Sequence, residues 1–195
     1  MAVGRRVRCM QRDLVLRASA GDHAAFSQLA TAVIGGLHRV AQLILRDDDL
    51  ANDAVQNALI AAWQDIRGLR DPDRFDPWLH RLTVRACYRV ARKERHRAFT
   101  EVQLVPMHDL PSVDDDQRLL AVRDQLERGF ARLSPEERAV LVLHYYLDLP
   151  LAEAADVLGI PLGTMKSRLN RATQALRAEL DAQDRASALS TGGIA

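Results

Sequence analysis

A predicted helix near the C-terminus places hydroxyl and guanidinium side chains on one face and apolar side chains on another. On a wheel of about 100° per residue, Ser167, Arg168 and Arg171 fall within roughly 60° of Thr164. A separate face carries Met165, Leu169, Ala172 and Leu176. Hydroxyl and guanidinium groups are donors with which proteins contact the base edges and phosphates of DNA. The spacing therefore predicts a helix that packs on one side and binds DNA on the other.

Local signals upstream define the helices that must position this one. Ser134 and Glu137 form an S-x-x-E capping box, with Pro135 at the first helical position. We expect this helix to run to about Asp148, with apolar positions that include Val140, Leu141, Leu143 and Leu147. A second, short helix is predicted over Leu151–Leu158, where it would bury Ala154, Ala155 and Leu158.

The turn between the short helix and the DNA-binding helix consists of Gly159, Ile160 and Pro161. Gly159 supplies a left-handed stop, and the turn length is typical of a helix-turn-helix. An ordinary helical hairpin in a protein core is the alternative. DNA binding is favoured because every charge between Asp156 and Glu179 is positive, namely Lys166, Arg168, Arg171 and Arg177.

The strongest basic block of the chain lies on another predicted helix, which Asp76 and Pro77 would cap and open. One acid, Glu94, stands there among the bases Arg81, Arg85, Arg89, Arg92, Lys93, Arg95 and Arg97. Arg85, Arg89 and Arg92 form one stripe that can follow a phosphate backbone, and displaced bases could lodge in the preceding loop, 67–75. A merely solvated surface is the alternative.

Two further helices are predicted before this block. The first carries apolar residues at helical spacing from Phe26 to Ile44, and Gly35-Gly36 would kink it or divide it in two. The run Asp47-Asp48-Asp49 then marks a break and the acidic N-terminus of the next helix, which leads to Trp63. The face opposite its apolar side carries Asn52, Asp53 and Gln56.

The periodic segments fall into two groups, which predicts an all-α fold of two small helical domains. The first domain covers 1–98 and the second covers 117–181. Between them, 99–116 has no sustained period and ends in the run Asp114-Asp115-Asp116, as expected for an irregular acidic linker. The last segment, 182–195, is small and polar and is predicted to be disordered.

Composition narrows the functional classes. The 195 residues carry a formal net charge of only +1, so DNA binding depends on where the charge lies. Cys9 and Cys87 lie far apart and predict neither a disulfide nor a zinc site. His80, Cys87 and His96 spread over more than two helical turns and cannot close on one ion. We therefore expect no metal and no cofactor.

Neither a catalytic motif nor a membrane segment is predicted. A Gly-rich phosphate loop, HExxH and GxSxG are all missing from the sequence, so we expect no catalytic residue, no enzymatic activity and no small-molecule substrate. No uninterrupted apolar run approaches the about 18 to 20 residues that span a bilayer, and the N-terminus lacks the apolar core of a signal peptide. A cytoplasmic protein without membrane insertion is expected.

The predicted helix-turn-helix resembles a known family. Its residues Glu153-Ala154-Ala155, Leu158-Gly159-Ile160, Gly163 to Leu169 and Arg171-Ala172 are similar to the tetrahelical, winged-helix-like region 4 of sigma-70 superfamily factors of the extracytoplasmic-function (ECF) type. In that family, region 4 binds the minus-35 promoter element. The resemblance implies DNA contacts by Thr164, Lys166, Ser167, Arg168, Asn170, Arg171 and Arg177. Pro150 and Pro161 replace hydroxyl caps common in the family, at about 1 kcal/mol apiece.

The stretch from Phe26 to Arg97 resembles region 2 of these sigma factors, which binds and melts the minus-10 element. The resemblance implies DNA contacts by Phe75, Trp78, Arg81, Arg85, Arg89, Arg92 and Lys93. The acidic helix face docks in this family on a coiled coil of the polymerase clamp, which implies polymerase contacts by Asp49, Asn52, Asp53, Gln56 and Trp63. Two departures are Asn52 and Asn57 where the family often has acids, and Arg85 and Arg89 where it often has Asn and Asp.

The resemblance therefore implies an ECF-type sigma factor whose partners are core RNA polymerase and promoter DNA. In such factors the acidic linker threads toward the polymerase active centre, and an anti-sigma factor usually holds the free protein, so we expect that partner too. The alternative is a helix-turn-helix repressor or activator that works without polymerase. Such a regulator has no evident use for a second basic helix beside Phe75 and Trp78.

Overall fold

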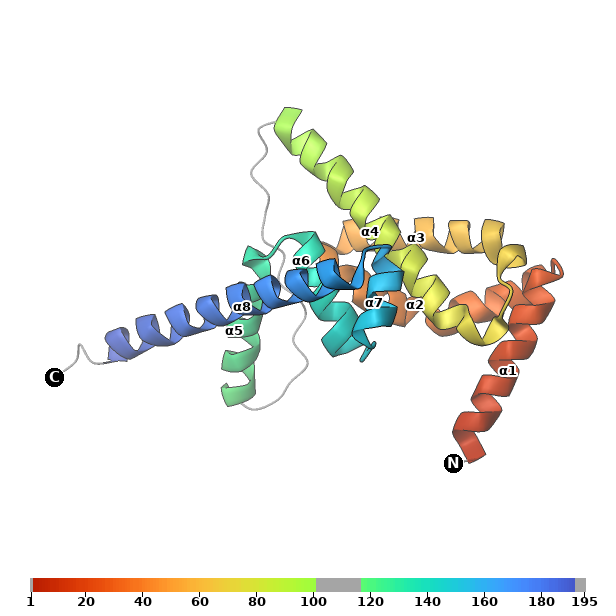
Figure 1. The fold of residues 1–195 in the computed structure, drawn as a ribbon, viewed down its shortest axis with the longest axis horizontal. Coiled ribbons are helices and arrows are strands. Elements are labelled where there is room, and N and C mark those ends of the chain that lie inside the picture. The colour runs from red at the N-terminus through yellow and green to blue at the C-terminus, as the bar shows by residue number, and fades with distance from the viewer. Residues whose placement is uncertain (1, 101–116, 192–195) are drawn as a thin grey trace. The chain divides into compact units, whose positions relative to one another are not determined.

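All regular structure in the described part of the chain is helical. The structure, a computed structural model, describes the backbone of residues 2–100 and 117–191 and the side chains of residues 11–96 and 125–182. The chain divides into two compact units, which are described separately. The N-terminal helices are α1 (Ala2–Ser19), α2 (His23–Leu45), α3 (Asp48–Asp65) and α4 (Phe75–Thr100). The C-terminal helices are α5 (Gln117–Arg132), α6 (Pro135–Leu141), α7 (Leu151–Leu158) and α8 (Leu162–Thr191) (Figure 1).

The all-α prediction is confirmed for these residues. Most of the predicted linker, 101–116, lies outside the described residues, and α4 extends to Thr100. Helix α8 continues to Thr191, through much of the segment predicted to be disordered from residue 182. The physical reason is that this segment is rich in Ala and contains neither Gly nor Pro before Gly192.

Side-chain caps set the helix boundaries in the N-terminal unit. The carboxylate of Asp22 accepts hydrogen bonds from the backbone N–H groups of Ala24 and Ala25 at the start of α2. Asp47 accepts one from Leu50 at the start of α3, as the acidic run predicted. Helix α2 is continuous through Gly35-Gly36, where the sequence left open a kink or a division into two helices.

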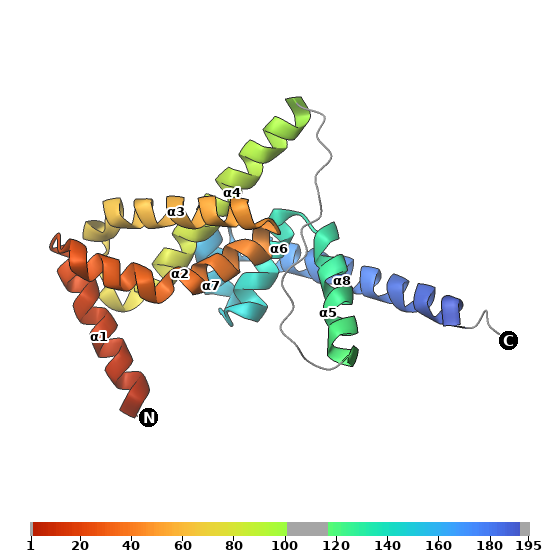
Figure 2. The same cartoon turned by 180° about the vertical axis from the view of Figure 1, so that it is seen from behind.

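Helices α2 and α3 lie side by side, and α4 packs against both (Figures 1 and 2). Their buried side chains include Leu29, Val40 and Ile44 of α2, Ala54 and Ala58 of α3, and Leu79 and Val84 of α4. The alanines of α3 allow its neighbours to approach closely. Helix α1 packs on α2 and on two short 3-10 segments before α4, η1 (Ile66–Gly68) and η2 (Pro72–Arg74).

Helix α4 begins two residues earlier than the sequence predicted, at Phe75 and not at Pro77. Asp76 was expected to cap it, but the helix starts at Phe75 and Asp76 lies in its first turn. Asp71 acts as the cap of the preceding segment η2, because its carboxylate accepts a hydrogen bond from the N–H of Asp73 at 3.0 Å. The chain thus enters α4 directly from η2.

By length and composition, α2 is the one described helix that is apolar enough to cross a membrane. The sequence predicted no apolar run long enough to span a bilayer. Helix α2 meets the criterion because Ala and Gly residues between its larger apolar residues keep its mean hydropathy high. Leu29, Leu37, Val40 and Ile44 are buried in the N-terminal core. Helix α2 also packs against α1, α3 and α4.

The capping box that opens α6 is formed in both directions, as predicted. The Oγ atom of Ser134 accepts a hydrogen bond from the N–H of Glu137 at 3.2 Å, and the Glu137 carboxylate accepts one from the N–H of Ser134 at 2.9 Å. Helix α6 ends at Leu141 and continues as a π-helical segment, η3 (Val142–Tyr146). The predicted helix to about Asp148 is therefore helical to Tyr146 but changes its hydrogen bonding after Leu141.

Helix α7 begins and ends at the predicted residues. Gly159 ends it in the left-handed conformation, with φ of +66°, and the N–H of Ile160 bonds to the carbonyl of Ala155 at 3.1 Å. Ala154 and Ala155 are buried as predicted. Val157 is buried too, whereas Leu158 is only half-buried because it is the last residue of the helix, beside the turn.

Candidate nucleic-acid interface

The start of α8 presents the predicted polar face to solvent. Its opposite side is buried, with Met165 and Ala172 both 0% exposed and Leu169 9% exposed. Lys166, Ser167, Asn170, Arg171 and Arg177 are exposed, whereas Thr164 and Arg168 are half-buried. The predicted separation of a packing face from a polar face is therefore confirmed.

Two members of this polar face make hydrogen bonds within α8. The Ser167 hydroxyl donates to the carbonyl of Thr164 at 3.0 Å, and the Asn170 side-chain oxygen accepts from Gln174 Nε2 at 3.4 Å. Within the described residues, Lys166 and Arg171 form no ion pair. Their charges remain available to an external anion.

Helix α5 supports α8 from the side, a relationship that the sequence did not predict. Arg132 Nε lies 3.4 Å from Glu179 Oε1, and Gln125 Nε2 donates to the carbonyl of Leu180 at 3.4 Å. Between these contacts, Gly129 faces Leu176. A glycine inside a predicted helix is the sequence signal that could have indicated this close approach.

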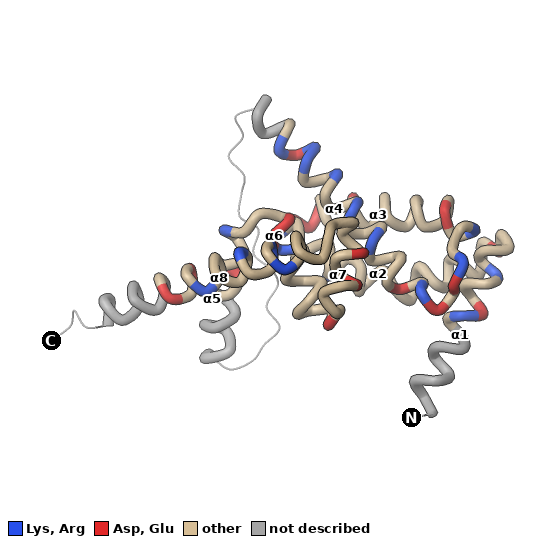
Figure 3. The backbone as a smooth tube through the Cα atoms, in the orientation of Figure 1, with Lys and Arg blue, Asp and Glu red and all other residues tan. Residues whose placement is uncertain are grey.

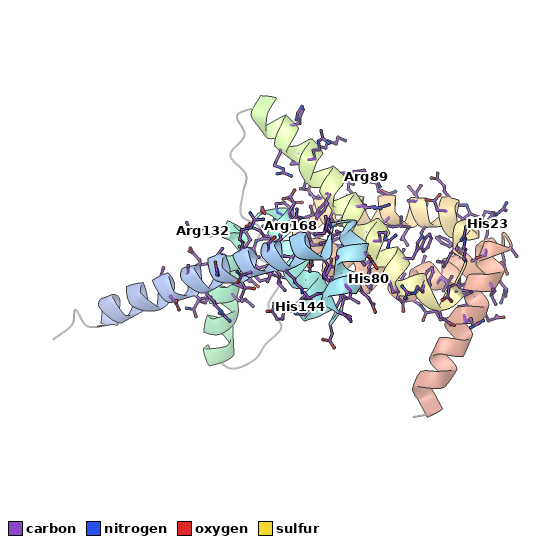
Figure 4. The ribbon with its side chains drawn as sticks, in the orientation of Figure 1. His23, His80, Arg89, Arg132, His144 and Arg168 are labelled. Atoms are coloured by element: carbon purple, nitrogen blue, oxygen red, sulfur yellow. The ribbon has the colours of Figure 1, made fainter. Side chains whose placement is uncertain are left out.

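Helix α4 carries an exposed basic stripe opposite its buried side. Arg85, Arg89, Arg92 and Lys93 are exposed, and none of them forms an ion pair with a described residue. Basic residues follow one another along the second half of α4 (Figure 3), and Arg89 projects from it in Figure 4. The predicted stripe is therefore present and accessible in the N-terminal unit.

Three other residues of the predicted minus-10 set are placed differently. Phe75 is only 2% exposed and its ring centroid lies 6.0 Å from that of Trp78, so it packs as a core residue in this structure, and its contact with DNA stays a prediction. It is the first residue of α4, where the core accommodates its apolar ring. Trp78 is half-buried, and Arg81 is half-buried with its Nε atom enclosed and without a hydrogen-bond partner among the described groups.

The polar face of α3 is exposed and acidic. Asp49, Asn52, Asp53 and Gln56 all lie on it, and α3 contains no Lys or Arg. Asn57 donates to the backbone carbonyl of Asp53 at 2.7 Å, so this contact does not engage the Asp53 carboxylate. The predicted docking residues other than Trp63 thus share one accessible surface.

Trp63 packs within the N-terminal unit, since its ring is held against α2, and its contact with polymerase stays a prediction. The ring centroids lie 4.2 Å from His23 and 5.0 Å from Phe26, and the side chain is half-buried. Such tilted aromatic contacts contribute about 0.5 to 1.5 kcal/mol beyond area burial. Trp63 therefore fixes α3 on α2 and supports the acidic face from one end.

Burial shifts the pKa of two side chains on α4, Cys87 and His80. Burial raises the pKa of the Cys87 thiol to about 12, which keeps it protonated and unreactive. Burial also lowers the pKa of His80, while Asp76 acts in the opposite direction. Within the described ranges, no group of three His, Cys, Asp or Glu side chains is arranged to hold a metal ion.

Comparison with known proteins places these surfaces in a family. Residues 29–97 match the protein family Sigma-70 region 2, and residues 123–176 match the family Sigma-70, region 4. The ECF RNA polymerase sigma factor SigM of Mycobacterium tuberculosis is 33% identical over 161 residues, which cover 82% of this chain and 79% of that protein.

Two solved structures share the fold. The structure of CnrH in complex with the cytosolic domain of CnrY has a TM-score of 0.61 and 28% identity, and it covers 89% of this chain and 98% of that one. The sigma factor RpoE in complex with the anti-sigma factor NepR, from Bartonella quintana, has a TM-score of 0.64 and 23% identity, with 80% and 96% coverage. The chain belongs to the ECF family of RNA polymerase sigma factors, which direct core polymerase to promoters.

Proposed function

We propose that three separate surfaces of this sigma factor bind the two promoter elements and core polymerase. The polar face at the start of α8 binds the minus-35 element. The basic stripe of α4, with the loop before it, binds the displaced strand at the minus-10 element. The acidic face of α3 binds core polymerase. In this proposal residues 1–98 form region 2, 99–116 the linker and 117–181 region 4.

The observation that carries the proposal is the polar face of α8. Met165 and Ala172 anchor one side of this helix in the core, which leaves Arg171 and Lys166 exposed on the helix that follows the turn. A guanidinium can bond two acceptors of a guanine in the major groove, whereas an ammonium acts on phosphates as a point charge. We assign Arg168 and Arg171 to base edges or the flanking backbone, and Lys166 and Arg177 to phosphates.

The stripe of α4 suits single-stranded DNA because its charges lie along one line and form no ion pair with any acid among the described side chains. Arg85, Arg89 and Arg92 would follow the phosphates of the displaced strand. Trp78, half-buried beside Phe75, offers part of its ring to an unstacked base. Phe75 supports that ring from the core.

The acidic face of α3 is the surface assigned to the polymerase. Asp49 and Asp53 are its exposed carboxylates, and the absence of basic residues on α3 gives this face one sign of charge. Charge of one sign steers association with a partner of the opposite sign. The asparagines at positions 52 and 57 make the face less negative than is common in the family.

Membership of the family also suggests where this chain works and with which partner. Its members regulate transcription without catalysing a reaction themselves, and polymerase is the enzyme. We propose that this chain works in the cytoplasm, where core polymerase and promoter DNA are present. We also propose an anti-sigma factor as a partner, supported by RpoE, a protein of the same fold, which was solved in complex with its anti-sigma factor NepR.

One experiment tests the function directly. Purified full-length chain, core RNA polymerase and genomic DNA fragments are mixed, and the resulting transcripts are sequenced. Specific start sites that appear only with the chain are expected, and they share two conserved spaced elements. A repressor or activator that works without polymerase would bind fragments without creating new start sites, and that result would refute the proposal.

A further inference from the structure

Helix α1 holds the loop between α3 and α4 at both of its ends. At the start of the loop, Ser19 Oγ lies 3.3 Å from the carbonyl oxygen of Ile66. At its end, Arg12 Nη1 lies 2.7 Å from Asp73 Oδ2. Gln11 Nε2 donates to Asp76 Oδ1 at 2.6 Å, in the first turn of α4. The exposed middle of the loop is therefore bracketed by contacts with a single helix.

The turn after α1 adds a further contact with the loop. Gly21 has φ of +99°, a conformation that favours glycine. A Cβ atom at this position would lie 3.2 Å from Arg67 Nη2, so the Arg67 guanidinium lies against the backbone of the turn. The position of this loop thus depends on residues far away in the sequence.

The acidic and basic side chains of the loop region differ in the contacts they make. Its carboxylates are Asp71, Asp73 and Asp76, and its guanidinium groups are Arg67, Arg70 and Arg74. Each carboxylate accepts a hydrogen bond from the protein, Asp71 from the N–H of Asp73 and the other two from α1. Arg70 and Arg74 are exposed and form no ion pair with any described residue. The carboxylates are therefore engaged in hydrogen bonds within the protein, whereas the guanidinium groups of Arg70 and Arg74 can bind DNA phosphates.

We propose that α1 positions the α3–α4 loop for the displaced DNA strand, and that Arg12 is the main positioning residue. By pairing with Asp73, Arg12 fixes the end of the loop and neutralises a carboxylate that would otherwise repel DNA phosphates. The inference rests on the proposed function of the loop as part of the minus-10 site. It adds a helix and a residue outside the stretch to which the minus-10 contacts were assigned.

The size of the effect follows from the exposure of the pair. The Arg12 and Asp73 side chains are 52% and 60% exposed, so solvent weakens their attraction. Exposed ion pairs change an equilibrium constant by up to about fivefold. Because single-strand binding is strongly electrostatic, an uncompensated Asp73 weakens it in addition to loosening the loop. Removing Arg12 is therefore expected to weaken the affinity for single-stranded DNA by about two- to fivefold, the range that exposed ion pairs contribute.

The test uses holoenzyme assembled from core polymerase and full-length chain. The probe is a fluorescent single-stranded oligonucleotide that copies the non-template strand across the minus-10 element of a promoter mapped by the transcript sequencing. The dissociation constant is measured for wild type, Arg12→Ala, Asp73→Asn and the double variant. Arg39→Ala is the matched control, since it removes one exposed charge from α2, and Arg39 forms no ion pair with a described residue.

The expected pattern is specific to positioning through Asp73. Arg12→Ala weakens binding most, because it frees the end of the loop and also leaves the Asp73 carboxylate uncompensated. Asp73→Asn and the double variant free the loop without that carboxylate, so both should show the same, smaller loss, and Arg39→Ala should lose nothing. Affinity for core polymerase and the unfolding temperature of Arg12→Ala stay unchanged, which a general loss of structure would not allow.

Two results overturn the inference. If Arg12→Ala binds like wild type, α1 does not position the loop. If Asp73→Asn binds like wild type while the double variant stays as weak as Arg12→Ala, Arg12 contacts DNA itself and does not act through Asp73. A wild-type holoenzyme that fails to prefer the probe over a scrambled strand refutes instead the assignment of the minus-10 site, and the inference with it.

Discussion

A Cβ atom built on Gly129 would lie 2.6 Å from Cδ1 of Leu176, so α5 and α8 approach each other where residue 129 has no side chain. A second leucine, Leu180, lies 3.9 Å from the same point. Gly129→Val would force the Leu176 side chain to move and would add two γ-carbons to a contact that is already close-packed. We expect a loss of about 1 to 3 kcal/mol in the stability of the C-terminal unit.

Hydrogen exchange of α5 and α8, followed by mass spectrometry, measures this loss in the unit concerned. Gly35→Val is the matched control, because a Cβ at Gly35 meets no atom within 4 Å in helix α2. Faster exchange only in the Gly129 variant is expected. Equal protection in both variants would show that Leu176 moves aside without cost.

Acid should destabilise the N-terminal unit through His80. Its pKa is lowered by burial, so the folded chain takes up the proton at lower pH than the unfolded chain, which does so near pH 6.5. The stability contributed by neutral His80 is therefore complete above about pH 6.5 and is lost as the pH falls toward the folded pKa. In urea unfolding, His80→Gln should lose less stability than wild type between about pH 7.5 and 5.5. Equal losses would contradict the shift.

Reversing one charge on α3 should prevent assembly with polymerase. Asp53→Lys puts a positive charge in the middle of the acidic face, and like charges facing each other across an interface cost several kcal/mol. We expect no co-elution of this variant with core polymerase in size-exclusion chromatography. Asp65→Lys makes the same change at the exposed end of the same helix and should co-elute like wild type. Capture of both variants would disprove the docking assignment.

The salt dependence of single-strand binding should report the interaction of Arg89 with a phosphate. For single-stranded DNA, removing one cationic side chain from a phosphate reduces the slope of log K against log salt by about 0.7. Arg89→Ala should show this reduction with the minus-10 oligonucleotide, whereas Arg39→Ala should keep the wild-type slope. An unchanged slope for Arg89→Ala would mean that its guanidinium binds no phosphate.

Local signals were sufficient to predict the helix-turn-helix. The Ser134–Glu137 capping box, the bounds of α7 and the glycine that ends it all depend on residues within a few positions of one another. The two faces of α8 follow from helical spacing alone. Sequence therefore predicted both the element and the side of it that stays in solvent.

Tertiary contacts decided what the sequence could not. An aromatic residue beside a basic helix is equally compatible with base stacking and with core packing, and the fold buries Phe75 and holds Trp63 against α2. Arg12 and Asp73 are separated by 61 positions, so no local pattern connects them. Only the packing of α1 on the loop brings them together.

Transcription from a mapped promoter with a substituted upstream element tests most directly whether α8 reads that element. Holoenzymes with wild type, Arg171→Ala and Arg128→Ala are compared on the intact and the substituted promoter; Arg128 is an exposed control on α5. One base contact is worth about 1 to 3 kcal/mol. The substitution should therefore reduce initiation strongly for wild type and Arg128→Ala and little further for the already weakened Arg171→Ala. Full discrimination by Arg171→Ala would contradict promoter recognition by this face of α8.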